Sequence, residues 1–246
     1  MPGFNLETMI WTQAQAVLTP ECVVVIPLGA QSKEHGYHLQ LNTDWLIAEY
    51  LKQRVVAVCE VVVVPTVNYH FFPSFVEYPG SITLRLETAR DLIVDICQSL
   101  SVFGPRRFYV LNTGVSTVRP LKAAAEELAL KSIVLRYTAW NEILAPVEAS
   151  ISEQEGGGHA DEIETSIMLY VAPNTVTMEK AVNEFRPGDG PLTRDPSGEG
   201  VYSASGVWGD ATLATVEKGR LATEALVKGV LADIEDLRNA AVIPHS

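Results

Sequence analysis

Short apolar runs rich in β-branched residues alternate along the chain with longer segments in which apolar residues recur every three or four positions. The runs have the length and composition of buried strands and lie at residues 22–26, 61–64, 108–111 and 133–137. The longer segments have the period of amphipathic helices and lie at residues 5–15, 44–55, 86–100, 121–130 and in a last stretch ending near 237. Strands that alternate with helices predict an α/β fold with a mainly parallel sheet and right-handed crossovers.

Length, composition and charge narrow the class of protein. The 246 residues suffice for one large α/β domain, and we expect residues 1–246 to form a single domain because we find no repeat, low-complexity tract or domain boundary. Hydrophobic residues make up 47% and charged residues 20%, which is typical of a globular enzyme. The net charge of −12 argues against nucleic-acid and anionic-membrane partners. Residues 1–15 lack the features of a signal peptide, and no run has the length of a membrane span. The three cysteines lie among apolar residues, as free thiols would, so we expect a cytoplasmic protein.

The loop after the first predicted strand carries four side chains that can ligate a metal ion: Glu34, His35, His38 and Asp44. Carboxylate and imidazole groups suit a hard or borderline divalent ion. A loop that leaves the carboxyl end of a strand is also where an open α/β sheet places its sites. We therefore expect a metal or catalytic site here. The alternative is a solvated Glu–His pair beside an aspartate that only caps the next helix, since Asp44 stands at the N-cap position.

Further candidate groups follow later strands. The turn 112–117 after the third strand should face the same crevice, where its hydroxyl groups could orient substrate or simply form the turn and cap the helix. His70 lies in an aromatic loop and is a weaker candidate ligand. His159 and Glu164 follow three glycines, and they can converge only if His159 precedes the helix, because five residues turn an ideal helix by roughly 140° from one face. Trp140 and Trp208 could line a pocket or pack in the core.

Three segments together resemble the creatininase (creatinine amidohydrolase) family. They are the segment 34–39 with Asp44, the segment His159 to Ser166, and the segment Gly206 to Gly219. The resemblance implies a three-layer α/β/α sandwich and a metal-dependent amidohydrolase that cleaves a non-peptide C–N bond in a small cyclic amide or formamide. It also implies homo-oligomers, hexamers among them.

The resemblance assigns roles to individual residues. It makes Glu34, His35 and Asp44 metal ligands, with Asp44 able to bridge two ions. It gives His159 a role in proton transfer and makes Glu164 a catalytic partner of that histidine or a further ligand. Zn, Mn or Fe would suit these mixed ligands. A metal-activated water would attack the amide carbonyl while His159 handles the proton.

Two positions depart from the usual family pattern. The turn that usually carries Asn-Gly-His contains Gly114 in place of the metal-ligating histidine. When the loop is aligned on His35, Lys33 takes the place of the usual glutamate. These changes are compatible with a mononuclear site, with replacement by His38 or His70, or with a non-catalytic binding or structural protein on the same scaffold. A metal-free hydrolase that uses Ser116 or Ser166 is disfavoured, because no Gly-x-Ser-x-Gly pattern surrounds either serine.

Overall fold

A parallel five-stranded sheet forms the centre of the computed structural model, which describes residues 2–242. In spatial order the strands are β1, β3, β2, β4 and β5, and every neighbouring pair is parallel. The five strands are β1 (Phe4–Asn5), β2 (Val23–Leu28), β3 (Val62–Val63), β4 (Arg107–Asn112) and β5 (Val134–Tyr137). The four predicted strands are therefore present, with bounds shifted by one or two residues.

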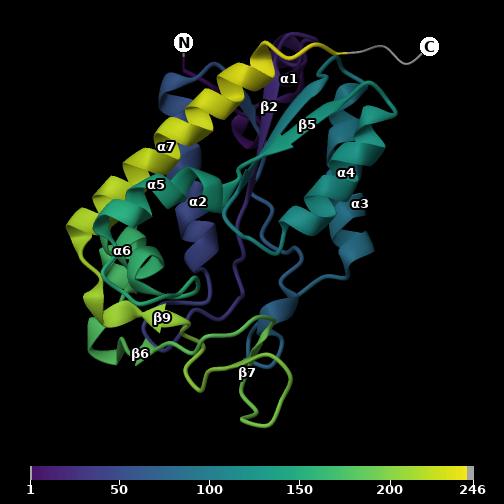
Figure 1. The fold of residues 1–246 in the computed structure, drawn as a ribbon. Coiled ribbons are helices and arrows are strands. Elements are labelled where there is room, and N and C mark those ends of the chain that lie inside the picture. Colours follow the sequence, from purple (N-terminus) through teal and green to yellow (C-terminus); the bar gives the residue numbers. More distant parts are fainter. Residues whose placement is uncertain (1, 243–246) are drawn as a thin grey trace.

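Helices cover both faces of the sheet. They are α1 (Trp11–Val17), α2 (Thr43–Val58), α3 (Leu86–Ser101), α4 (Val118–Ala129), α5 (Trp140–Ile151), α6 (Glu162–Val171) and α7 (Val216–Arg238). Residues of α1, α3 and α4 pack in one hydrophobic core, and residues of α2, α5, α6 and α7 pack in the other. Figure 1 shows α3 and α4 on one side of the strands and α7 running along the opposite side. The expected three-layer α/β/α sandwich is confirmed.

The central strand β2 explains why the two cores form. All six of its residues are buried. Side chains alternate between the two faces of a strand, so Val24, Ile26 and Leu28 enter the core with α3 and α4. Val23 and Val25 enter the core with α2 and α7. A continuous apolar run is what a strand covered on both faces requires.

The topology places a crevice at the carboxyl ends of β2 and β4. These strands are neighbours, yet the helices that follow them, α2 and α4, lie on opposite faces of the sheet. The chain therefore leaves the two strands in opposite directions, which is the arrangement at which open α/β sheets bind ligands.

The amino-terminal segment differs from the predicted helix over 5–15. Residues Phe4–Asn5 form a short edge strand beside β3, a single 3-10 turn follows at Leu6–Thr8, and only then does α1 begin. A two-residue strand has no detectable hydrophobic period, so pairing with β3 decides its conformation rather than local sequence.

Residues 183–210 form two small ribbons at the carboxyl edge of the main sheet, below it in Figure 1. One ribbon is antiparallel and the other parallel. They consist of β6 (Asn183–Glu184) with β9 (Gly209–Asp210), and of β7 (Leu192–Thr193) with β8 (Val201–Tyr202). The predicted long loop at 185–199 therefore contains one short strand. None of the helices within residues 2–242 is long and apolar enough to cross a bilayer.

Candidate metal centre

The loop between β2 and α2 brings a buried lysine, an aspartate and a histidine into contact. The Nζ atom of Lys33 lies 2.8 Å from Oδ2 of Asp44, and Nε2 of His35 lies 3.0 Å from Oδ1 of the same carboxylate. All three side chains are almost inaccessible to solvent. The sequence predicts that Asp44 stands at the N-cap of α2, and this is wrong. The helix begins at Thr43 after the N-cap residue Asn42, and the carboxylate of Asp44 points to Lys33 and His35 instead.

A second group comes from the segment that leads into α6. Nε2 of His159 lies 2.6 Å from Oε1 of Glu34, and Nδ1 of His159 lies 3.6 Å from Oε2 of Glu164. The other oxygen of Glu164, Oε1, lies 3.6 Å from Nε2 of His35. Glu164 therefore joins the two groups. His159 precedes the helix, which is the condition under which the sequence allowed His159 and Glu164 to meet.

The start of α6 is fixed by its own side chains. Asp161 is the N-cap residue, and its carboxylate accepts hydrogen bonds from the backbone N–H groups of Ile163 and Glu164, each at 3.0 Å. Gln154 donates a further hydrogen bond to Asp161 at 2.7 Å. Such a cap satisfies N–H groups that have no partner within the helix. It also holds Glu164 in the first turn, where its side chain reaches both histidines.

Hydrogen bonding indicates which nitrogen of each histidine faces the centre of the site. Nδ1 of His35 donates to the carbonyl oxygen of Lys33 at 2.9 Å, because a carbonyl can only accept. In the neutral imidazole this leaves the lone pair of Nε2 directed at the carboxylates of Asp44 and Glu164. In the same way Nε2 of His159 donates to Glu34, and its Nδ1 faces Glu164. A lone pair that faces a carboxylate is compensated either by a proton on the imidazole or by a metal ion between the two groups.

A possible metal-binding group in residues 2–242 consists of His35, His159 and Glu164, whose ligand atoms lie within 4.8 Å of one another. Its two imidazoles and one carboxylate suit Zn²⁺, Mn²⁺ or Fe²⁺. Each histidine donates its other N–H to an oxygen acceptor, as metal-ligating histidines usually do. The residues present therefore fit a divalent metal ion.

Charges inside the site outweigh the effect of burial. Burial alone would raise the pKa of Asp44, but the adjacent Lys33 and His35 hold that pKa well below its usual range. Burial would lower the pKa of Lys33, yet the charges of Asp44 and Glu164 keep it above its ordinary value. The lysine and the aspartate therefore form a charged pair around neutral pH.

The Glu34–His159 pair behaves in the same way. Burial opposes charge on both groups, but His159 lowers the pKa of Glu34, and Glu34 raises the pKa of His159. Two glycines position the glutamate. The backbone N–H of Gly36 donates to Oε2 of Glu34 at 2.9 Å, and Gly206 packs directly against the carboxylate, where a Cβ atom would collide with it. Ala160, next to His159, has a positive φ of 47°, which is strained for a residue with a side chain.

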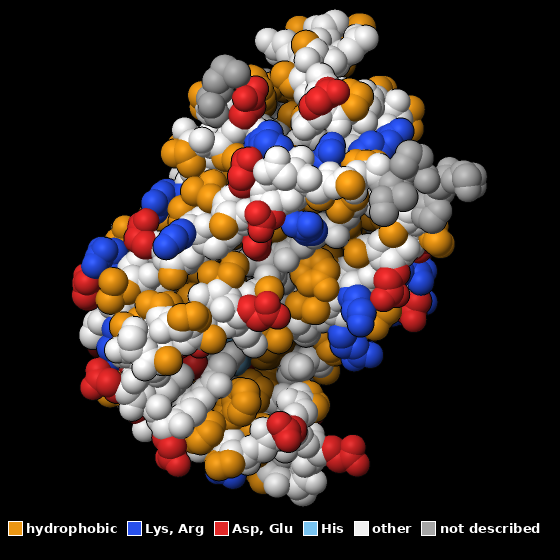
Figure 2. Space-filling model, turned by 45° about the horizontal axis from the view of Figure 1, so that its top comes forward, with side chains coloured by type: hydrophobic (Ala, Val, Ile, Leu, Met, Phe, Trp, Pro, Cys, Tyr) orange, Lys and Arg blue, Asp and Glu red, His pale blue; other side chains and the backbone are white. Residues whose placement is uncertain are grey.

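A pocket of about 720 Å³ opens onto this centre. Its lining includes Lys33, His159, Glu164, Phe75, Trp140 and Trp208. The ring of Phe75 lies 4.2 Å from that of His159, between centroids. Figure 2 shows histidine surface in a hollow bordered by hydrophobic side chains. Apolar walls around a few convergent polar groups are typical of a small-molecule site.

The two alternative histidines lie in different surroundings. Nε2 of His38 contacts Oγ1 of Thr165 at 2.7 Å, and burial lowers the pKa of His38 to about 4. His70 is fully buried, its Nε2 contacts the carbonyl oxygen of Ala89 at 3.1 Å, and burial lowers its pKa to about 4 as well. Neither histidine belongs to the three-residue group.

The turn after β4 uses its hydroxyl groups for local structure. Oγ1 of Thr113 donates to the carbonyl oxygen of Leu28 at 3.1 Å or to that of Asp44 at 3.2 Å. Oγ of Ser116 donates to the carbonyl oxygen of Phe71 at 3.1 Å. Thr117 precedes α4 and bonds within the turn rather than capping the helix with its side chain.

Sequence reasoning missed one charged member of the site. It treated Lys33 only as a substitution at a ligand position and gave its ammonium group no partner. The available signal was a lysine in a loop of glycine and apolar residues, close to two carboxylates. A lysine is almost never buried unless a carboxylate pairs with it, so a buried Lys33 requires a partner among these carboxylates.

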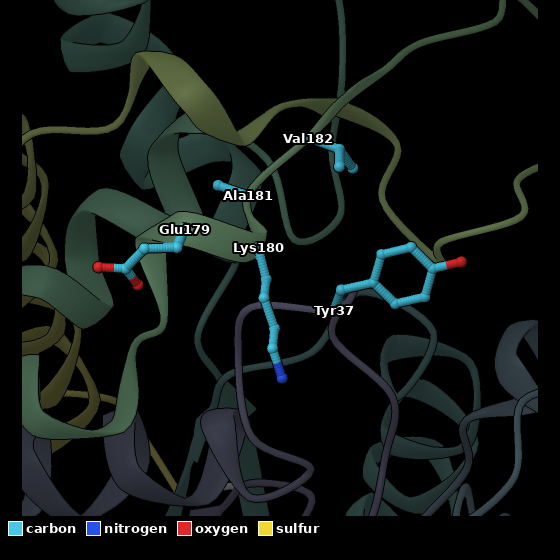
Figure 3. A pocket seen from close by; sticks show the side chains of 5 residues that line it. All are labelled: Tyr37, Glu179, Lys180, Ala181 and Val182. Atoms are coloured by element: carbon cyan, nitrogen blue, oxygen red, sulfur yellow. The ribbon is translucent and has the colours of Figure 1, made fainter.

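A second pocket, of about 460 Å³, lies on the outer side of the same loop. Figure 3 shows its lining: the ring of Tyr37 and the side chains of Glu179, Lys180, Ala181 and Val182. Glu179 and Lys180 point away from each other in this view, and the pocket holds none of the three clustered ligands.

Comparison with known proteins identifies the family of this chain. A family model described as creatinine amidohydrolase matches residues 7–234. A creatinine amidohydrolase of Pseudomonas putida is 26% identical, over 93% of this chain and 95% of the relative. A mycofactocin precursor peptide peptidase of Mycolicibacterium smegmatis is 29% identical, over 84% of this chain and 82% of the relative.

Solved structures show the same fold. A mutant creatininase superimposes with a TM-score of 0.81 at 24% identity, over 96% of this chain and 99% of that one. A structure described as creatininase Mn has a TM-score of 0.76 at 23% identity, over 98% and 100%. A mutant described as the Zn–Zn type has a TM-score of 0.75 at 22% identity, over 98% and 100%. The family model covers most of the chain, and the chain belongs to the creatinine amidohydrolase family of hydrolases.

Proposed function

We propose that the protein is a metal-dependent amidohydrolase that cleaves a C–N bond in a small cyclic amide or formamide. The observation that carries the proposal is the orientation of His35. Its Nδ1–H is used by the carbonyl oxygen of Lys33, so the lone pair of Nε2 faces two carboxylates. A divalent ion between these groups would neutralise them.

The residues that would hold the ion are His35 and Glu164, with Oδ1 of Asp44 beside His35, while Nδ1 of His159 faces the same carboxylate of Glu164. When bound, such an ion lowers the pKa of a water molecule and polarises a carbonyl group. Glu34 fixes the ring of His159 through the contact at 2.6 Å, so that its other nitrogen faces the centre. That nitrogen can accept or return a proton at the reacting atoms.

The pocket supports a small substrate. The rings of Phe75 and Trp208 contribute to its walls. Apolar walls bind the body of a small amide and exclude water from the reacting bond. A peptide bond is the second candidate, because a relative that is 29% identical is a peptidase by name.

The first test is metal content per chain, measured by mass spectrometry on protein purified without an affinity tag or added metal. We expect a tightly held transition-metal ion in the wild-type protein and its loss in Glu164→Gln. Glu179→Gln, in the pocket of Figure 3, is the matched control and should keep the ion.

Turnover is then measured by chromatography with mass spectrometry on creatinine, other cyclic amides, formamides and short peptides. Hydrolysis that a chelator abolishes and added Zn²⁺ or Mn²⁺ restores supports the proposal. A folded protein that holds no metal and binds none on addition would contradict it, and would favour a non-catalytic protein on this scaffold. Cleavage of peptides alone would favour the second candidate.

Assembly into homo-oligomers stays a prediction. Light scattering during size-exclusion chromatography measures the mass in solution, for which the chain mass of 26.8 kDa is the reference. A multiple of that mass would support it.

A further inference from the structure

Lys33 is a buried cation inside the site. Only 5% of its surface is exposed. Its Nζ lies 2.8 Å from Oδ2 of Asp44, and 4.8 Å from the ring centroid of Phe75. A buried ammonium group is stable only when a carboxylate compensates its charge, and the aromatic face adds a weaker attraction. The loop therefore holds one fixed positive charge in contact with Asp44.

Asp44 divides its two oxygens between different neighbours. Oδ2 contacts the ammonium group of Lys33, whereas Oδ1 contacts Nε2 of His35. His35 belongs to the group of three possible ligands. The carboxylate thus lies between Lys33 on one side and the potential metal position on the other. A carboxylate in that place can bridge two cations, one of which is the ammonium group itself.

Beside Asp44, the ammonium group of Lys33 lies near aromatic rings, and the charges of Glu164 and Glu34 also act on it. The nearby turn contains Gly114, which has no side chain to ligate an ion. A Cβ atom at this glycine would lie 3.3 Å from Cγ2 of Thr117 and 3.6 Å from the ring of Phe72. Nζ of Lys33 lies 5.7 Å from the centroid of that ring. The three atoms nearest to that Cβ position are a methyl carbon, a hydroxyl oxygen and an aromatic carbon.

We propose that the ammonium group of Lys33 takes the place of a second divalent cation, so that the site binds one divalent metal ion and not two. Asp44 would then pair with the ammonium group through Oδ2, leaving Oδ1 on the side of His35 and the ion. The inference rests on the proposed metal-dependent function and specifies its metal stoichiometry.

Two features of the site act together to exclude a second ion. The charge of Lys33 repels any cation that approaches Oδ2 of Asp44. Lys33 and Gly114 also stand at the two positions where the family usually has a glutamate and a histidine, so neither position offers a ligand. Replacing Lys33 by glutamate removes the repulsion and adds a carboxylate.

The experiment is a calorimetric titration of metal-free protein with Co²⁺, combined with metal analysis after dialysis. We expect one Co²⁺ per chain for the wild type and for Lys33→Arg, which keeps the charge. We expect two for Lys33→Glu. Lys52→Met is the matched control, because Lys52 is also buried and pairs with Glu7 at 2.9 Å, outside the site. It should bind one ion.

A second variant protects the test if Lys33→Glu fails to fold, as judged by circular dichroism. Lys33→Met removes the charge and adds no ligand, and it should lower the Co²⁺ concentration for half-saturation at least ~10-fold, since electrostatic repulsion is lost. An unchanged half-saturation in Lys33→Met would overturn the proposal.

The remaining outcomes separate the stoichiometry from the function. Two ions in the wild type, or one in a folded Lys33→Glu, would overturn the role of Lys33 while leaving a metal-dependent enzyme in place. No ion in either protein would overturn both.

Discussion

The loops after β2 and β4 lie side by side at the same edge of the sheet, and both are rich in polar residues. Of these two loops, only the β2 loop has charged and polar side chains that face one another without local hydrogen bonds that pair all of their atoms. There Asp44 and Glu164 carboxylates face the lone pair of His35. The comparison teaches that the number of polar residues at a sheet edge indicates little about a site. What matters is which polar atoms local hydrogen bonds leave available.

In the β4 turn, Asn112, Gly114 and Thr117 form hydrogen bonds with one another. Oγ1 of Thr117 donates to Oδ1 of Asn112 at 2.6 Å or to the carbonyl oxygen of Gly114 at 2.7 Å. The side-chain amide of Asn112 donates to the same carbonyl oxygen at 2.6 Å, and the N–H of Gly114 donates back to Asn112. The turn therefore supports the wall of the pocket without charged groups of its own.

Asp44→Ala should have the largest effect, because it removes both a neighbour of the metal position and the only carboxylate paired with Lys33 in the ion pairs of residues 2–242. We expect loss of bound metal and, in metal-free protein, a fall of about 3–5 kcal/mol in the free energy of unfolding, since a buried charge is left unpaired. Urea denaturation with a chelator measures the second effect. The double variant Asp44→Ala/Lys33→Met should recover most of the stability. A double variant no more stable than the single one would show that the ion pair is not the cause.

His159→Ala should reduce turnover by about 100-fold to 10,000-fold, the usual contribution of a proton-transfer group. It should leave the ion in place, because a nitrogen that carries the proton does not also ligate the ion; loss of the ion would make His159 a ligand instead. Steady-state kinetics and Co²⁺ titration measure turnover and metal binding. Ser116→Ala, in the β4 turn, is the control and should change neither. Equal losses in both variants would show that the β4 turn contributes to the site as much as His159 does.

His38 should make the stability of the metal-free protein depend on pH. Its folded pKa of about 4 lies below the ordinary value of 6.5, so the unfolded state binds more protons between these values. Stability should therefore fall as the pH decreases from 6.5 to 4, by up to about 3 kcal/mol at about 1.4 kcal/mol per pKa unit. In His38→Gln this decrease should be smaller, as measured by chemical denaturation at each pH with a chelator. Parallel pH profiles for the two proteins would contradict the assignment.

Thr117→Val should have the smallest effect. It removes the hydrogen bond of the hydroxyl group within the β4 turn, while Asn112 and Gly114 keep the bonds that they make to each other, and it should cost about 0.5–1.5 kcal/mol of stability. Metal content should stay at the wild-type level, because the turn supplies no ligand to the group of three. Loss of metal in this variant would show that the β4 turn takes part in binding after all.

Much of the fold follows from the sequence because burial on two faces leaves a simple pattern. The run that became β2 is apolar throughout, and the helices between strands have a clear period. The edge strand β1 could not be predicted, since two residues have no period and their conformation depends on pairing with β3. The position of Asp44 was also mistaken, because Asn42 and Asp44 are both good N-cap residues and only the contact with Lys33 separates them.

The sequence indicated which residues belong to the site better than how they are connected. The sequence motifs identify His35 and His159 as candidate site residues. The donor group that they form with Glu164, however, depends on a contact between two distant parts of the chain. The ion pair of Lys33 with Asp44 also depends on how the loop folds back, since its two residues are separated by a turn and the start of a helix. Spacing along the chain does not predict contacts between distant segments. Residue type, by contrast, indicates which side chains can ligate a metal ion.

The contact between Glu34 and His159 joins residues 125 positions apart. The donor group is therefore complete only after the first β-α unit and the start of α6 have come together, so an unfolded chain holds no preformed site. An ion that binds the folded chain alone would stabilise it by about 2.7 kcal/mol at a free concentration 100 times the dissociation constant. Metal supply would then affect the amount of folded protein as well as its activity.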